Sequence, residues 1–174
     1  MIIRLAETAD IPAIMSVINT VVPAMNAAGN YQWDYTYPNP QVFEKDIKLK
    51  QLWLALIDNN IAGVAAITTD QDPEYAEVGW DIEETAIVVH RLAVNTGYQG
   101  KGVAKALMQK AEEIAIERGI DVLRIDTNSE NAATQALFPK LGYQFAGEIG
   151  LDFRPGLRFY CYEKRISLPA TQKP

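Results

Sequence analysis

Hydrophobic positions along the chain change between a helical period and a strand period, and each change marks the border of a predicted element. After Thr8, apolar residues recur every three or four positions, which predicts a helix that Pro23 and Gly29 end. Asn39-Pro40 provides a cap and a first-turn proline for a second helix through about Lys50. Two further helices are predicted, each followed by a glycine: Val103–Arg118 and about Ala132–Leu141.

Short runs of β-branched or alternating residues predict the strands. They are Ile2–Leu5, Leu52–Ile57, Ile61–Thr68, Thr85–Val94, Val122–Thr127, Tyr143–Ile149 and Leu157–Lys164. The Asp58-Asn59-Asn60 turn joins the second and third as a hairpin, and an Arg154-Pro155-Gly156 turn separates the last two. This order predicts an α/β fold with a mixed sheet. We expect a single domain over residues 1–166 and a loose tail at 167–174.

Composition narrows the class of protein. The 174 residues are 48% apolar, which suits one domain with a sizeable core. No apolar run approaches the ~18 residues of a membrane span, and Arg4, Glu7 and Asp10 argue against a signal peptide. The single cysteine, Cys161, excludes an internal disulfide framework and favours a reducing cytoplasm. With one histidine and one cysteine, no metal cluster is expected.

Charge is unevenly distributed along the chain. The formal net charge of −6 argues against a nucleic-acid-binding protein, which normally has a basic face. No Lys or Arg occurs between Gln51 and His90. The same stretch contains Asp58, Asp70, Asp72, Glu74, Glu77, Asp81, Glu83 and Glu84. It is either a solvated loop around Pro73 or the source of a negative field that attracts cationic amines, and both can hold.

A glycine-containing hexad, Gln99–Ala104, joins the predicted strand Thr85–Val94 to the helix that follows. Such a junction directs unpaired backbone N–H groups and the positive end of the helix dipole at one spot, which favours a diphosphate. The phosphate-binding loop of nucleotide triphosphatases is excluded because Val103 follows Gly102. The dinucleotide fingerprint is excluded because Lys105 stands where it needs a small residue.

The pattern Gln99-x-x-Gly102-x-Ala104, preceded by Leu92-Ala93-Val94, resembles the acetyl-CoA signature of the GNAT-superfamily N-acetyltransferases. The later segment from Asn131 to Leu137-Phe138-Pro139-Lys140-Leu141-Gly142-Tyr143 resembles a second block of that family. The resemblance covers roughly residues 2–165. It implies a mostly antiparallel, twisted sheet of about seven strands, with helices on both faces and two splayed central strands.

The resemblance also implies acetyl-CoA as the cofactor. Backbone groups of Leu92, Ala93 and Val94 would pair with the pantetheine amides, and Asn131 would lie near the same arm. The residues that would wrap the diphosphate are Gln99, Gly100, Lys101, Gly102, Val103 and Ala104. For Asn131, an ordinary helix cap is an equally good interpretation, and the two roles can coexist.

Candidate catalytic residues are His90, Asp126 and Tyr143. His90 lies on the strand that leads to the acyl site and is either a proton relay or a satisfied core residue. Asp126 is either a base or the partner of Arg91 or Arg124. Many family members have a tyrosine that protonates the leaving thiolate where this chain has Phe138, and a phenyl ring cannot donate a proton. Tyr143, Tyr160 or water could replace it.

Candidate acceptor contacts come from the polar and aromatic stretch after the first helix. Trp33, Asp34 and Tyr35 could hold an ammonium group by charge and cation–π attraction, although Trp33 and Tyr35 are equally candidate core anchors, Trp33 the stronger of the two. Tyr160 would form the opposite wall, and Cys161 is expected to be buried and inert.

These features predict an N-acetyltransferase in which a primary amine attacks acetyl-CoA directly within a ternary complex. The alternative is a non-catalytic acyl-CoA-binding or sensing module that lost its acid at Phe138. The expected partner is a small-molecule or peptide amine rather than a nucleic acid or a membrane. A homodimer is one option, since the sequence leaves the oligomeric state open.

Overall fold

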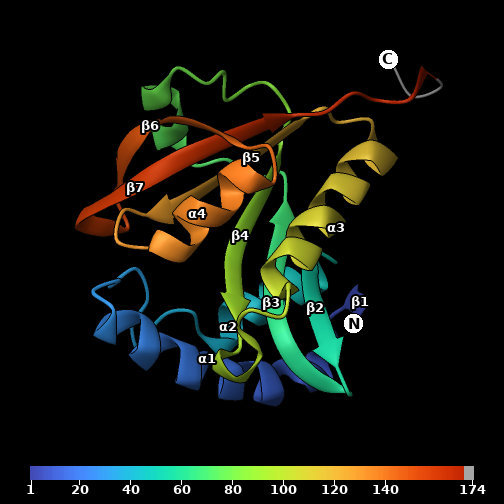
Figure 1. Cartoon of the computed structure of the whole chain (residues 1–174), viewed down its shortest axis with the longest axis vertical. Coiled ribbons are helices and arrows are strands. Elements are labelled where there is room, and N and C mark those ends of the chain that lie inside the picture. The colour runs from blue at the N-terminus through green and yellow to red at the C-terminus, as the bar shows by residue number, and fades with distance from the viewer. Residues whose placement is uncertain (171–174) are drawn as a thin grey trace. The chain divides into compact units, whose positions relative to one another are not determined.

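The computed structural model describes residues 1–170 and shows an α/β fold whose strands form one mixed sheet in the order β1-β2-β3-β4-β5-β7-β6 (Figure 1). The helices are α1 (Ile11–Ala27), α2 (Pro40–Lys48), α3 (Val103–Arg118) and α4 (Ala132–Lys140). The strands are β1 (Ile2–Leu5), β2 (Leu52–Ile57), β3 (Asn60–Thr68), β4 (Ile87–Val94), β5 (Val122–Asn128), β6 (Gln144–Leu151) and β7 (Arg154–Arg165). The predicted fold class is confirmed.

The chain forms two compact units. Unit 1 comprises residues 1–67 and 89–110, and unit 2 comprises residues 68–88 and 111–174. Both β4 and α3 begin in one unit and continue into the other. The predicted single domain over residues 1–166 and the predicted splay of the central strands stay predictions. Of the tail predicted at 167–174, residues 171–174 lie outside the described part.

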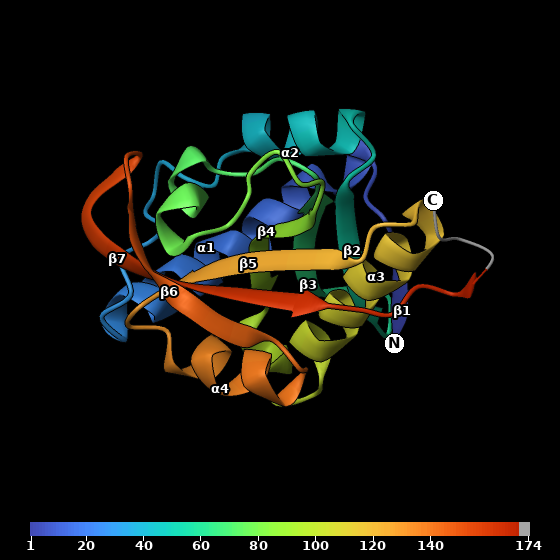
Figure 2. The ribbon, with the colours of Figure 1, turned by 90° about the horizontal axis from the view of Figure 1, so that it is seen from above.

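In unit 1, β1 and β3 both pair antiparallel with β2. The two-residue turn between β2 and β3 has positive φ angles at Asp58 (+49°) and Asn59 (+61°), as a tight hairpin requires. α2 and the first turns of α3 lie on opposite sides of β2 and β3 (Figure 2). The core on the α1 and α2 side contains Ile14, Val17, Ile18, Val21, Val22, Phe43, Leu52, Leu54, Val64 and Ala66.

α1 is the main core helix of unit 1, and it continues past the predicted end at Pro23 to Ala27. A proline inside a helix removes one backbone hydrogen bond. Here the buried apolar positions that precede Pro23, together with the partly buried Met25 after it, stabilise the helix. Within the described residues, Thr8–Ala27 is the one helix with the length and hydropathy of a membrane span. Its apolar side packs into the core of unit 1, which accounts for that composition.

In unit 2, β7 pairs antiparallel with β5 on one side and with β6 on the other. β4 adds a parallel pair at Ile87–Leu123 and Val88–Arg124. Successive β7 side chains point to opposite faces, so Phe159 and Cys161 pack with η2 (Pro73–Val78), whereas Tyr162 packs on α4. η2 and α4 accordingly lie on opposite sides of these strands (Figure 2).

The turn predicted at Arg154-Pro155-Gly156 is wrong, because these residues begin β7. Leu151 pairs with Arg154, so the turn consists of the two intervening residues, 152 and 153. Gly156 has a φ of +82° within the strand and lies opposite an irregularity in β6. Proline and glycine therefore mark a strand irregularity here rather than a turn.

Candidate active site

The segment between β4 and α3 is anchored to β3 through Asn95. The Asn95 backbone N–H donates to the Ala62 carbonyl at 2.8 Å, and the side-chain Nδ2 donates to the Ile61 carbonyl at 3.0 Å. Its Oδ1 accepts from the Gly97 N–H at 3.1 Å and starts the short turn η3 (Thr96–Tyr98). Asn95 therefore fixes where the glycine loop leaves the strand, a role that was not predicted from the sequence.

Two glycines shape the loop before α3. Gly100 and Gly102 have φ angles of +75° and +76°, a left-handed conformation that suits glycine. A Cβ added at either position would meet no heavy atom within 4 Å. The main chain is therefore open at both positions, and a large group can approach it closely.

The first turn of α3 presents uncapped amides. The Ala106 N–H donates to the Gly102 carbonyl at 3.0 Å and closes this turn. Among residues 1–170, no carbonyl or side chain accepts from the N–H groups of Val103, Ala104 and Lys105. These donors, at the positive end of a helix dipole, fit a diphosphate. The hexad thus has the backbone features expected of a diphosphate site.

The hexad side chains differ in exposure. Gln99, Gly100, Lys101 and Gly102 are exposed, Ala104 is half-buried and Val103 is buried. The Lys101 ammonium lies over the Tyr98 ring, 5.0 Å from its centroid. The open side of the loop is therefore formed by its main chain and by one cation.

Gly63 on β3 allows this loop to pack tightly in unit 1. A Cβ at Gly63 would lie 2.5 Å from Val103 Cγ1 and 2.9 Å from the Ala93 carbonyl oxygen. Only glycine fits between β4 and the start of α3 at these distances. This requirement was missed in the sequence, although an isolated glycine within an apolar strand was the available signal.

The predicted acyl-donor strand is the part of β4 that belongs to unit 1. His90, Leu92 and Val94 are half-buried, and Ala93 is buried. Between His90 and Leu92, Arg91 has a φ of +54°, which is unusual for a residue with a side chain. The strand therefore has an irregular backbone directly before the residues predicted to receive the pantetheine arm.

Most of the acceptor contacts predicted after α1 are used within that segment or in the core. Trp33 is 4% exposed and belongs to the core, so the interpretation as a core anchor is confirmed and its ring is not available to an acceptor. Asp34 Oδ1 accepts from the Thr36 N–H at 2.7 Å and from the Thr36 hydroxyl at 2.6 Å. Tyr35 is 97% exposed at the tip of this turn. Of the two aromatic residues predicted as acceptor contacts in this segment, Tyr35 is therefore the one with an exposed ring.

In unit 2, Asp126 accepts a hydrogen bond from the Tyr75 hydroxyl at 2.6 Å. Tyr75 is fully buried, and burial followed by the Asp126 charge raises the pKa of its phenol well above the usual value. The phenol therefore remains protonated and stabilises the ionised form of a half-buried carboxylate. The predicted pairing of Asp126 with Arg91 or Arg124 stays a prediction beside this hydrogen bond.

The buried Arg124 side chain holds the loop between β3 and β4 through several hydrogen bonds. Its guanidinium donates to Glu163 at 2.9 Å, to Glu84 at 3.0 Å and to the Asp81 carbonyl at 2.9 Å, and it also bonds to Gln71. It lies 4.9 Å from the centre of the Trp80 ring, and Trp80 in turn makes an edge contact with Tyr75 at 5.1 Å. Part of the acidic stretch is thus an ordered loop whose charge is neutralised from β5.

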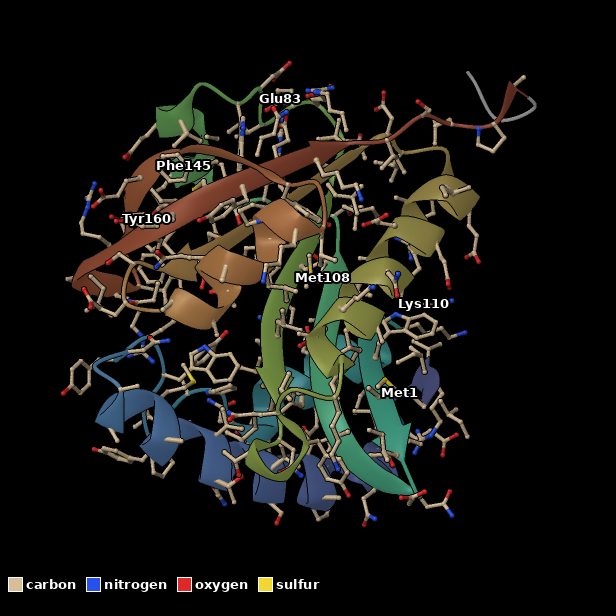
Figure 3. All side chains as sticks on the ribbon, in the orientation of Figure 1. Met1, Glu83, Met108, Lys110, Phe145 and Tyr160 are labelled. Carbon is tan, nitrogen blue, oxygen red and sulfur yellow. The ribbon has the colours of Figure 1, made fainter. Side chains whose placement is uncertain are left out.

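The residues predicted around α4 have mainly packing roles. Asn131 caps the helix, since its Oδ1 accepts from the Thr134 N–H at 3.3 Å. Phe138 is buried and its ring centroid lies 6.0 Å from that of Tyr143. Burial raises the pKa of the Tyr143 phenol, and within residues 1–170 its hydroxyl has no hydrogen-bond partner. Tyr160 is half-buried beside Phe145, with ring centroids 5.4 Å apart (Figure 3).

The predicted site residues therefore divide between the two units. Unit 1 brings His90, Leu92–Val94 and Gln99–Ala104 together along one strand, loop and helix. Unit 2 brings Asp126 to Tyr75 and places Asn131 and Phe138 on α4. Tyr75 was not predicted, because its phenol reaches Asp126 across 51 positions of the sequence.

Comparison with known proteins agrees with this fold. The human N-acetylaspartate synthetase is 25% identical over 112 residues, which are 64% of this chain but 33% of that protein. The chain therefore spans about a third of the length of that relative. The L-methionine sulfoximine/L-methionine sulfone acetyltransferase of Pseudomonas aeruginosa is 29% identical over 150 residues, which are 84% of this chain and 82% of that protein.

A solved structure of a GNAT-family acetyltransferase from Streptococcus agalactiae superposes with a TM-score of 0.80 at 27% identity and covers 95% of both chains. The family model of the GNAT acetyltransferases matches residues 24–143, which include β4, the glycine hexad, α3 and α4. This match spans more than half of the sequence and contains both blocks on which the resemblance depends. The chain belongs to the acetyltransferase (GNAT) family.

Proposed function

We propose that this chain transfers the acetyl group of acetyl-CoA to a primary amine in a ternary complex. The observation that supports it best is the open loop at Gly100 and Gly102, followed by three amides without an internal acceptor. These donors would hold the diphosphate, and the backbone of Leu92–Val94 would hold the pantetheine arm. Acetyl-CoA supplies an activated thioester carbonyl, and the protein supplies orientation and proton transfer.

The acceptor must lose a proton to react. An amine with a pKa near ~10 is neutral in about one molecule in a thousand at pH 7, so a group that accepts its proton lowers an effective barrier of ~4 kcal/mol. We assign this role to Asp126 or His90. Asp126 is supported by the Tyr75 hydrogen bond, which favours an ionised carboxylate. The new N–C bond then forms as the C–S bond breaks.

The leaving thiolate would depart without an acid at position 138. Phe138 has no proton to donate and is buried. Tyr143 is buried as well and has a raised pKa, so it is a poor acid near neutral pH. We therefore expect the thiolate to be protonated by water or by the proton taken from the amine. The ordinary pKa of the thiol already makes the thiolate a fair leaving group.

Amino acids are the first acceptors to test. One relative is named for acetylation of L-methionine sulfoximine and L-methionine sulfone, and another for synthesis of N-acetylaspartate. The assay mixes acetyl-CoA with these amino acids, other small amines and peptide N-termini, and follows thiol release. Amine-dependent release supports the transferase. Tight coenzyme A binding without release would support the non-catalytic sensing module, which the acetyltransferase relatives do not favour.

The loop itself is tested with matched glycine variants. Gly156 also has a positive φ and no heavy atom near its missing Cβ, but it lies in β7. We expect Gly100→Ala and Gly102→Ala to raise the Kd for acetyl-CoA at least tenfold by calorimetry, whereas Gly156→Ala leaves it unchanged. Equal affinity in all three variants would contradict the assignment of the loop.

Location and assembly complete the proposal. We expect the protein to act in a reducing cytoplasm, where the buried Cys161 remains a thiol whose pKa is raised by burial. Light scattering on the purified chain would decide between a monomer and a homodimer.

A further inference from the structure

Arg91 holds β4 in an unusual shape. Its φ of +54° is left-handed, which is unfavourable for any residue with a Cβ and rare inside a strand. One left-handed residue changes the direction of the peptide groups on either side of it. The backbone of Leu92–Val94 therefore depends on the conformation of the residue that precedes it.

A buried ion pair fixes the Arg91 side chain. Its Nε and Nη2 atoms donate to the two carboxylate oxygens of Asp46, each at 2.7 Å. The Asp46 side chain is 2% exposed and that of Arg91 is 15% exposed. Asp46 also accepts from Gln51 Nε2 at 2.9 Å, and Arg91 Nη1 donates to the Tyr37 hydroxyl at 3.3 Å. The planar guanidinium is thus held in one orientation by groups of unit 1.

The strand segment after Arg91 is fixed at both of its ends. At the far end, Asn95 donates to two carbonyls of β3. In between, the Ala93 carbonyl lies against Gly63. At the near end, the Asp46 ion pair holds the side chain of the residue with the left-handed backbone angle. The three residues assigned to the pantetheine arm therefore lie between contacts on both sides.

We propose that Asp46 is a positioning residue for the acyl donor, because through Arg91 it imposes the left-handed bend that orients the backbone of Leu92–Val94. This inference rests on the proposed binding of acetyl-CoA to that strand. Asp46 lies on α2 and bonds to the guanidinium of Arg91 on β4. A hydrophobic pair of similar volume could fill the same space, so packing alone does not require a buried charge here.

The variant Arg91→Gly tests the backbone bend separately from the ion pair. Glycine adopts a positive φ without steric cost, so Arg91→Gly keeps the bend available but removes the guanidinium. Alanine at the same position removes the guanidinium and also disfavours the bend. If the ion pair serves to hold the bend, only the alanine variant should lose affinity for the cofactor.

The experiment measures the Kd for acetyl-CoA by calorimetry and the melting temperature of each variant. We expect Asp46→Asn and Arg91→Ala to raise the Kd about tenfold, and Arg91→Gly to stay within about threefold of the original protein. Asp46→Asn should have no further effect in the Arg91→Gly background. The matched control is Asp10→Asn, which breaks the two-bond Arg4–Asp10 ion pair of the same unit and should leave the Kd unchanged.

Two results would overturn the inference. One is an Asp46→Asn protein that binds acetyl-CoA as the original chain does, and the other is an Arg91→Gly protein as weak as Arg91→Ala. If Asp46→Asn does not fold, the double variant with Arg91→Gly decides in the same way, since near-original affinity supports the inference and a tenfold loss overturns it. An original chain that fails to bind acetyl-CoA would instead contradict the proposed function.

Discussion

Arg91 on β4 and Arg124 on β5 have side chains that are 15% and 1% exposed, and their charges are neutralised in different ways. Arg91 places two of its nitrogen atoms on one carboxylate, that of Asp46. Arg124 shares its hydrogen bonds among two glutamates, a glutamine and a backbone carbonyl, and stacks on Trp80. A two-bond contact to one carboxylate gives a defined orientation, whereas bonds to two carboxylates and two neutral oxygens give redundancy.

The difference in hydrogen-bond partners corresponds to the part of the chain that each arginine contacts. In the inference above, Arg91 holds the backbone angle at a single residue, for which one two-bond contact to a carboxylate is sufficient. Arg124 holds a loop whose contacts extend from Gln71 to Glu84, so its bonds are spread along the sequence. A substitution near Arg91 should therefore have a large local effect, whereas a substitution near Arg124 should be partly compensated.

Loss of the Asp46 carboxylate is the strongest test of this contrast. Asp46→Ala leaves a charge that is 15% exposed without its carboxylate, and we expect unfolding to become easier by about 3–5 kcal/mol. Urea denaturation of the protein, followed with probes in unit 1, would measure this loss of unfolding free energy. Gln51→Ala, which removes only one hydrogen bond to Asp46, should cost about 1 kcal/mol. If Asp46→Ala cost less than about 1 kcal/mol, water or another group would have to neutralise Arg91.

Removal of the Tyr75 hydroxyl should have the next largest effect. Tyr75→Phe keeps the ring against Trp80 but leaves Asp126 without a 2.6 Å donor, and we expect a loss of about 1–3 kcal/mol. Thermal or urea unfolding would measure it. Tyr35→Phe is the control, because that side chain is 97% exposed and its hydroxyl should contribute almost nothing. Equal stability of both variants would show that water replaces the phenol at Asp126.

Loss of one glutamate from Arg124 should be mild. Glu84→Ala leaves Arg124 with Glu163, Gln71 and the Asp81 carbonyl, and the Glu84 side chain is itself 33% exposed. We expect a loss of about 1 kcal/mol or less. Removal of both glutamates should exceed the sum of the single losses, because only then does the guanidinium have no carboxylate. Strict additivity in this double-mutant cycle would contradict the redundancy described above.

The Arg4–Asp10 pair, whose side chains are 38% and 18% exposed, should have the smallest effect, although its two bonds at 2.8 Å resemble those of Arg91 and Asp46. Hydrogen bonds from Arg4 lower the pKa of the Asp10 carboxyl. Because the folded pKa is the lower one, this stabilisation is present above the ordinary value of 3.8 and is lost as the pH falls through the folded value. Asp10→Asn should cost below about 1 kcal/mol near pH 7. Denaturation curves of the two proteins should converge as the pH falls below 4, and a difference that persists there would exclude an ionic cause.

Local signals predicted most of the fold. Helical and strand periods depend on neighbouring residues, so β1, β2, β5 and α3 lie close to the predicted ranges. The errors occur where tertiary packing overrides a local breaker. Pro23 lies inside α1, where buried residues precede it and the partly buried Met25 follows it. Pro155-Gly156 lies inside β7 because pairing with β6 continues past it.

The binding loop could be predicted because it is contiguous in sequence, whereas the residues that orient it are distant. Arg91 and Asp46 are 45 positions apart, and Asp126 and Tyr75 are 51 positions apart. No helical or strand period connects such pairs. One signal for Asp46 was available, since it follows the buried Phe43 by three positions and therefore shares the inner face of α2. A carboxylate at an apolar position indicates a buried cation.

Two other helices of this protein begin with an asparagine that completes their first turn. Asn39 accepts from Val42 at the start of α2, and Asn131 accepts from Thr134 at the start of α4. Within residues 1–170, α3 begins after a glycine and has no such cap, so its first N–H groups are open to an acceptor from outside the chain. We expect coenzyme A to act as the cap of α3, so that its binding would raise the melting temperature of the folded chain.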